Sequence, residues 1–77
     1  MKQILAPLPG VFYRRSSPSE PVLVNEGTAL AAGTSIGLIE AMKSFFPVEA
    51  EEASVLVRFL VENGDAVDAD QPIAEVE

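Results

Sequence analysis

The residues best suited to carry chemistry lie around one lysine, in the stretch Glu40-Ala41-Met42-Lys43-Ser44. A lysine amine is a nucleophile that proteins use for covalent chemistry. The sequence has no cysteine and no histidine, so it holds neither a disulfide framework nor a Cys/His zinc site. Lys43 is therefore either a solvated surface lysine or a group that the fold is built to present.

Other chemistry-bearing residues are few. Glu51-Glu52 and Asp68 with Asp70 form pairs of acids, which we interpret as solvated turn residues. We find no convincing pair of nucleophile and base, no metal-ligand cluster and no glycine-rich phosphate loop. We therefore predict that the protein has no catalytic residues and no metal, and that it catalyses nothing by itself.

Short apolar stretches recur along the chain, and most gaps between them contain Gly, Pro, Asn or Asp. This spacing is typical of the strands of an all-β sandwich or barrel. A helix over 50–61 is the best alternative, but Val55 to Val61 is rich in β-formers and is followed by an Asn-Gly-Asp turn signal. The apolar stretches are Ile4-Leu5, Val11–Tyr13, Val22–Val24, Ile36–Ile39, Phe45–Val48, Val55–Val61 and Ile73–Val76.

An internal repeat relates the two halves of the chain. Residues 23–40 align with residues 60–77 at a constant offset of 37, with 7 identities in 18 positions. Two copies of one β unit, each covering the apolar face of the other, explain such a repeat. Gly27 and Gly64 are equivalent in it, and we expect both to occupy turns with positive φ.

The repeat also exposes an insertion in the first half. Residues 6–13 align with residues 50–57 at an offset of 44, and 44 − 37 = 7 extra residues precede Leu23. They fall in the segment 14–21, with the sequence RRSSPSEP, which we expect to project as a loop. Such loops often carry function, although a tolerated surface insertion remains open.

Lys43 falls where the two repeats meet. One strand is expected to end near Glu40 and the next to begin near Phe45, which places Lys43 in the hairpin turn. This turn lacks the Asn-Gly or Asp-Gly that two-residue hairpins prefer, and Met42 is unusual at an exposed turn. Something other than turn formation therefore selects these residues.

Composition limits the remaining classes. The 77 residues suffice for one small domain, spanning 1–77. A net charge of −7 argues against nucleic acid as a partner, and no apolar run approaches the length of a membrane span. Pro7 and Pro9 interrupt the apolar N-terminal stretch, so a signal peptide is not expected, and the lack of cysteine fits a cytoplasmic protein.

Three stretches together resemble the biotin carboxyl carrier proteins of bacterial acetyl-CoA carboxylases, within the biotinyl and lipoyl attachment domains. EAMK, at 40–43, looks like the biotin attachment motif, and GVFYRRSSPSEP, at 10–21, is similar to a tyrosine-led loop of that family. VEAEEASVLVRFLVENGDAVDADQPIAEVE, at 48–77, is similar to its closing half. The resemblance covers about residues 5–77.

The resemblance implies a fold and a site. The fold would be a flattened barrel, or sandwich, of two four-stranded antiparallel sheets, with the lysine at a hairpin tip opposite the chain ends. Lys43 would carry biotin in amide linkage, and Glu40, Ala41 and Met42 would be read by a biotin protein ligase. The inserted loop, residues 14–21, would be the family's thumb, with Ser17 and Pro18 near the biotin.

The resemblance also implies a role. Biotin would be carboxylated by a biotin carboxylase, and the flexible lysine–biotin arm would deliver the carboxyl group to a carboxyltransferase acting on an acyl-CoA. Acetyl-CoA, used in fatty acid synthesis, is the expected acceptor. The protein would be a non-catalytic carrier that binds these two enzymes and the ligase.

Departures from the family pattern leave alternatives open. Ser44 and Phe46 replace the family's usual Met and Asn, and Pro47 replaces a polar residue, which fits only an edge strand or a bulge. Strand alternation would bury one of Phe45 and Phe46 and expose the other. A lipoyl domain shares the fold, but its site usually reads Asp-Lys-Ala. An unmodified interaction module with the same fold is the second alternative.

Overall fold

The computed structural model describes residues 2–77, which form an all-β fold. Within these residues, no helix is long and apolar enough to cross a membrane. The segment 50–61 contains a strand, as predicted, and not the alternative helix. The strands are β1 (Lys2–Leu5), β2 (Gly10–Tyr13), β3 (Ala29–Leu30), β4 (Ser35–Ala41), β5 (Ser44–Glu49), β6 (Ser54–Phe59), β7 (Ala66–Val67) and β8 (Pro72–Val76).

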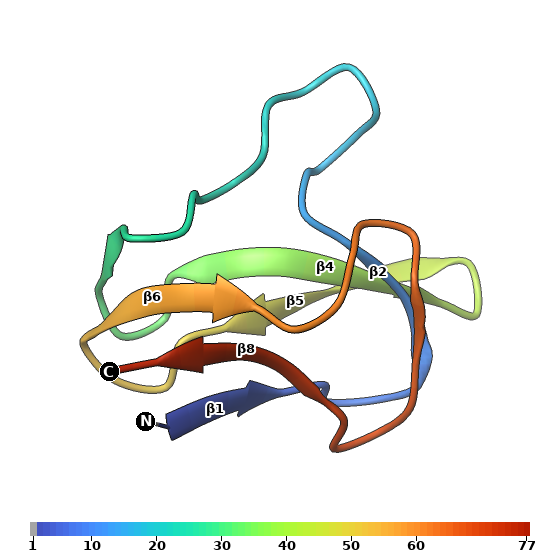
Figure 1. The fold of residues 1–77 in the computed structure, drawn as a ribbon. Helices are drawn as coiled ribbons and strands as arrows, with labels where there is room; N and C mark the ends of the chain where they lie inside the picture. Colours follow the sequence, from blue (N-terminus) through green and yellow to red (C-terminus); the bar gives the residue numbers. More distant parts are fainter. Residues whose placement is uncertain (1) are drawn as a thin grey trace.

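The strands form two four-stranded sheets, with the orders β1-β8-β6-β3 and β5-β4-β2-β7. Every pairing is antiparallel. This confirms the predicted fold class. Lys2, at the start of β1, pairs with Val76, at the end of β8, at one side of the sandwich, whereas the β4–β5 hairpin extends to the opposite side (Figure 1).

The core lies between the two sheets. Apolar residues that alternate along the strands place one side chain in two inside the sandwich. The largest side chains that are completely buried come from both halves of the chain and are Phe12, Ile36, Ile39, Val48, Leu56 and Ile73. The inner face of the sheet β5-β4-β2-β7 thus packs on the core, which supports the base of the β4–β5 hairpin.

Pseudo-two-fold symmetry relates the sheets, as the repeat predicts. An offset of 44 relates β1 to β5 and β2 to β6, and an offset of 37 relates β3 to β7 and β4 to β8. The order β1-β8-β6-β3 in one sheet therefore corresponds to the order β5-β4-β2-β7 in the other. The equivalent turn glycines Gly27 and Gly64 have φ values of 90° and 93°. Their N–H groups donate to Leu56 O at 2.6 Å and Phe12 O at 2.7 Å, which are also equivalent. The two halves therefore use the same turn for the same purpose.

One apolar stretch behaves differently from the prediction. Val22–Val24 forms no strand and lies in the connection 14–28, where the Leu23 N–H donates to Arg14 O at 2.8 Å. The sheets instead gain the two-residue strands β3 and β7, which the sequence pattern did not indicate. Hydrophobicity alone misled here, because the backbone of this stretch closes the inserted loop and pairs with no strand.

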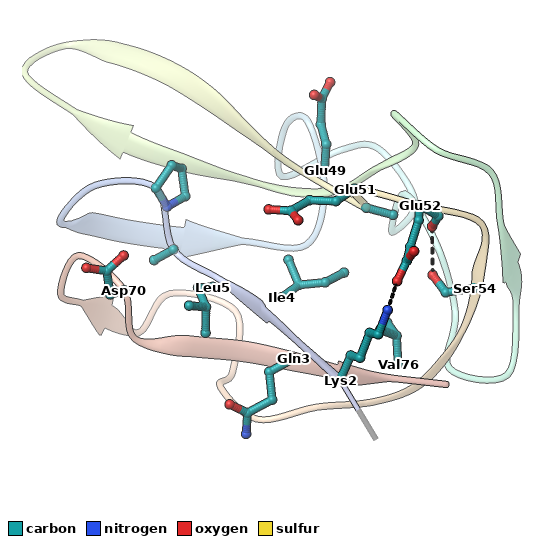
Figure 2. A pocket seen from close by; sticks show the side chains of 13 residues that line it. Lys2, Gln3, Ile4, Leu5, Glu49, Glu51, Glu52, Ser54, Asp70 and Val76 are labelled. Carbon is teal, nitrogen blue, oxygen red and sulfur yellow. Dashed lines mark hydrogen bonds and ion pairs between the residues drawn. The ribbon is translucent and has the colours of Figure 1, made fainter.

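An ion pair joins distant segments near the N-terminus. Lys2 Nζ of β1 donates to a carboxylate oxygen of Glu52, in the turn between β5 and β6 (Figure 2). Both side chains are exposed. The pair links the first strand of one sheet to the turn that leaves the other sheet.

Candidate functional site: the Lys43 hairpin and its groove

A tight two-residue hairpin presents Lys43. Ala41 of β4 pairs with Ser44 of β5, so Met42 and Lys43 alone form the turn. Their φ values are 52° and 67°, which is the left-handed conformation at both central positions of a type I′ turn. The predicted hairpin is therefore present, and its strands reach one residue further toward the turn than expected.

Both side chains of the turn are exposed to the solvent. Met42 is 92% exposed, and Lys43 is also exposed. Among residues 2–77, no hydrogen bond or ion pair engages the Lys43 amine. Burial therefore does not explain the methionine, and the free amine is open to a large partner.

A groove of about 460 Å³ lies beside this hairpin. It brings Ser17 and Pro18, the two thumb residues that were predicted to lie near the biotin, together with Glu40. Ala41, Met42 and Lys43 do not line it and form the hairpin tip instead. The full lining is Tyr13, Arg15, Ser16, Ser17, Pro18, Glu40, Phe45 and Asn63.

Strand pairing explains how the groove forms. Glu40 faces Phe45 across β4 and β5, and Tyr13 of β2 lies on the same outer face because its neighbour Phe12 points into the core. The Tyr13 hydroxyl donates to Glu40 Oε1 at 3.4 Å. The connection 14–28 leaves the sandwich directly after Tyr13 and projects from it (Figure 1), so its first residues form the opposite wall.

Three groove residues were missed by reasoning from the sequence. Tyr13 and Phe45 were recognisable, because alternation from the buried Phe12 and from the hairpin places both on the outer face. Asn63 gave no such signal. It comes from the second half of the chain, and its Oδ1 accepts a hydrogen bond from the Arg14 N–H at 2.7 Å.

The prediction that one of Phe45 and Phe46 is buried is wrong. Phe45 is 56% exposed and Phe46 is 39% exposed. Phe45 lies on the outer face, and Phe46 pairs with the buried Ile39 on the inner face. Phe46 is nevertheless exposed because β5 is an edge strand, and because the hairpin extends past the strands of the other sheet (Figure 1).

Pro47 lies in an edge strand, which is one of the two positions that the sequence analysis allowed for it. It lies in β5, which is at the edge of its sheet, where the missing N–H of proline costs no pairing with a further strand. The edge position also leaves this side of the hairpin free for a partner.

A second cavity, of about 390 Å³, lies where β1 and β5 approach each other, and it shares no lining residue with the groove. Ile4 and Leu5 form part of its wall, and Glu49, Glu51, Glu52 and Asp70 surround them (Figure 2). The predicted acid pairs are exposed here and in the nearby turn, as expected for solvated turn residues.

This chain is similar in sequence and in structure to known proteins. A family model described as "Biotin-requiring enzyme" matches residues 2–77. The biotin carboxyl carrier protein of acetyl-CoA carboxylase from Nostoc is 33% identical over 99% of this chain and 42% of its own length. The protein of the same name from Porphyra purpurea is 36% identical over 96% of this chain and 47% of its own length.

The fold is also similar to a solved structure, the urea carboxylase of Kluyveromyces lactis, with a TM-score of 0.82 and 28% identity. The match covers 99% of this chain and 6% of that enzyme. The chain thus spans less than half the length of these two curated relatives and a small part of the carboxylase.

Proposed function

This chain belongs to the family of biotin-requiring enzymes, and from that premise we propose that it is a biotin carboxyl carrier domain with biotin on Lys43. Biotin is the cofactor of the family. The observation that carries the proposal is the hairpin tip, where Lys43 is exposed within EAMK, in a turn that adopts the left-handed conformation without glycine or asparagine.

The residues present fit a covalently attached group. Lys43 supplies a primary amine that has no partner among residues 2–77, so an amide bond to its Nζ displaces no interaction of the fold. The amide removes one positive charge and takes the net charge from −7 to −8. Glu40, Ala41 and Met42 are the residues that a biotin protein ligase reads in this proposal.

Bound biotin supplies a ureido nitrogen that accepts a carboxyl group at one enzyme and releases it at another. The chain's own contribution is mechanical. The base of the β4–β5 hairpin is anchored by the buried core residues Ile36, Ile39 and Val48, and its tip extends past the other sheet and presents Lys43 to the solvent (Figure 1). A long flexible side chain on this tip gives the attached group a high effective concentration at both active sites, as a swinging arm.

The partners follow from this role. They are a biotin carboxylase, a carboxyltransferase and a biotin protein ligase, and the contacts with them are small and transient because each must leave for the next. The names of the relatives support acetyl-CoA as the acceptor, in fatty acid biosynthesis. The location that we propose for this chain is the cytoplasm. In this role the domain, residues 1–77, catalyses nothing by itself.

The test is the intact mass of the protein co-expressed with a biotin protein ligase. The chain has two lysines, Lys2 and Lys43, which provides a matched control. We expect wild type and Lys2→Arg each to gain one biotinyl group and Lys43→Arg to gain none. Labelling of Lys43→Arg would place the site elsewhere, and an unlabelled wild type would reject the biotinyl proposal.

The exposed Phe45 and Phe46 favour one alternative, an interaction module that keeps the fold without modification. An apolar surface at the hairpin tip suits direct contact with a protein. A wild type that gains no mass with either a biotin or a lipoate ligase would support the module, whereas a lipoyl adduct would support a lipoyl carrier.

A further inference from the structure

Arg14 occupies the neck of the inserted loop. Its N–H donates to Asn63 Oδ1 at 2.7 Å, and its carbonyl oxygen accepts from the Leu23 N–H at 2.8 Å. The second of these bonds closes the thumb into a loop, and the first ties that loop to a turn of the second half. The backbone of Arg14 therefore joins the two ends of the thumb to each other and ties them to the second half of the chain.

The side chain of Arg14 makes a second set of contacts. Its guanidinium carbon lies 4.2 Å from the centre of the Phe59 ring, and Nη2 donates to Val24 O at 3.4 Å. Phe59 belongs to β6 and contacts the core residue Phe12, with ring centres 5.9 Å apart. A planar guanidinium can stack on an aromatic face and donate at its edge at the same time, which an ammonium cannot.

The internal symmetry provides a comparison. The offset of 44 that relates β2 to β6 makes Arg58 the equivalent of Arg14. Arg58 is exposed, and it pairs with Glu75 at the surface. Arg14 is half-buried, and its Nε–H is buried without a hydrogen-bond partner among residues 2–77. The half that carries the thumb thus accepts an unsatisfied donor at the position where the other half has an ordinary surface ion pair.

We propose that Arg14 is a positioning residue that holds the thumb in place beside Lys43. By stacking on Phe59 and bonding to Val24, it orders the thumb before any partner arrives, so that Ser17 and Pro18 face Glu40 and Phe45 across the groove. An enzyme that binds around the Lys43 arm then contacts a thumb that is already ordered, so binding does not include the entropic cost of ordering the thumb. This last consequence rests on the proposed carrier function, whereas the ordering of the thumb does not.

The first test measures motion in the unmodified protein. We expect backbone NMR order parameters of Ser16, Ser17 and Ser19 to be close to those of the strands in wild type. In Arg14→Gln they should fall below about 0.6, the range of flexible segments, while β4 and β5 stay near about 0.85. Arg14→Lys should give intermediate values, because it keeps the charge and loses the planar group. The symmetry-related Arg58→Gln is the matched control and should leave the thumb unchanged.

A thumb that is equally ordered in wild type and Arg14→Gln, or equally flexible in both, would overturn the proposal. Thermal unfolding of each variant checks that it is folded. If Arg14→Gln does not fold, Phe59→Leu decides the question, since it keeps the arginine and removes the aromatic face. Phe59→Leu should also loosen the thumb, and an unchanged thumb in that variant would contradict the role of the stack.

The second test measures biotinylation kinetics with a biotin protein ligase. Arg14→Gln should raise the KM for the domain by roughly three- to tenfold, with kcat nearly unchanged, because the ordering cost enters at binding. A fall in kcat at unchanged KM would overturn this use of the thumb. If wild type is not biotinylated at all, the carrier function fails, and the NMR comparison alone decides whether Arg14 positions the thumb.

Discussion

Met42 and Lys43 adopt a backbone conformation that neither residue type favours. Left-handed φ values cost an ordinary L-residue roughly 1–2 kcal/mol, and type I′ turns therefore prefer Asn-Gly. Here both positions carry long side chains, and Met42 is almost completely exposed. The cost is explained if a partner reads these side chains, since the fold itself gains nothing from them.

Met42→Asn should therefore stabilise the protein while impairing recognition. Asparagine tolerates the left-handed region, so we expect a gain of about 1 kcal/mol, or a Tm higher by about 4–8 °C for a domain of this size. Biotinylation by the ligase should be slower in the same variant. Met42→Leu is the control, because it keeps an apolar side chain and the unfavourable conformation, and its Tm should not change. A Tm that falls in Met42→Asn would show that the methionine serves the fold.

At the scale of the elements, the two halves show which turn features are general. Gly33 and Asp70 are equivalent by the offset of 37, and both have positive φ, at 87° and 65°. Their N–H groups donate to the equivalent acceptors Ala50 O and Ala6 O, each at 2.8 Å. The turn therefore needs the conformation and does not need glycine. Gly37 of β4 differs, because a Cβ there would lie 2.5 Å from Phe12 Cε1 and 2.7 Å from Tyr13 O.

Two glycine substitutions should consequently have unequal effects. Gly37→Ala forces a methyl group against the completely buried Phe12, and we expect a loss of about 1–3 kcal/mol in the free energy of unfolding. Gly33→Asn meets no atom within 4 Å and should cost less than about 1 kcal/mol. Urea denaturation of the two variants beside wild type measures the difference. Equal losses, or a larger loss in Gly33→Asn, would contradict this account of β4.

For the whole molecule, contacts between segments far apart in the chain hold the sandwich closed at the end away from Lys43. The Lys2–Glu52 pair is one of them. The hydrogen bond to Glu52 and the attraction of its negative charge raise the pKa of Lys2 above its ordinary value of 10.5. Because the pKa is higher in the folded state than in the unfolded state, the pair contributes fully below the unfolded pKa. The contribution disappears as the pH rises through the folded pKa.

The stability difference between wild type and Lys2→Gln should follow this pH dependence. We expect a small constant advantage of wild type near about pH 9, which disappears toward about pH 12. Tm values across the range measure the effect, which solvent exposure keeps small. An advantage that grows with pH would have the wrong sign for this ion pair.

The arrangement of the two halves and of the inserted loop can be read from the amino-acid sequence alone. A constant offset of 37 between residues 23–40 and 60–77 requires two equivalent β units, and the change to an offset of 44 locates the inserted loop before Leu23. The stretch around Lys43 falls at the junction of the repeats, and a junction between two antiparallel units is a hairpin. These inferences succeed because strand periodicity and turn residues are local properties of the chain.

Which surfaces are exposed, and which contacts hold the thumb, became known from the three-dimensional packing. Alternation along β5 cannot tell that the hairpin extends past the opposite sheet, so both Phe45 and Phe46 are exposed. The stack of Arg14 on Phe59 joins residues 45 positions apart, and no local pattern records it. Burial and side-chain contacts depend on which segments meet in space, and that is settled by the packing of the whole chain.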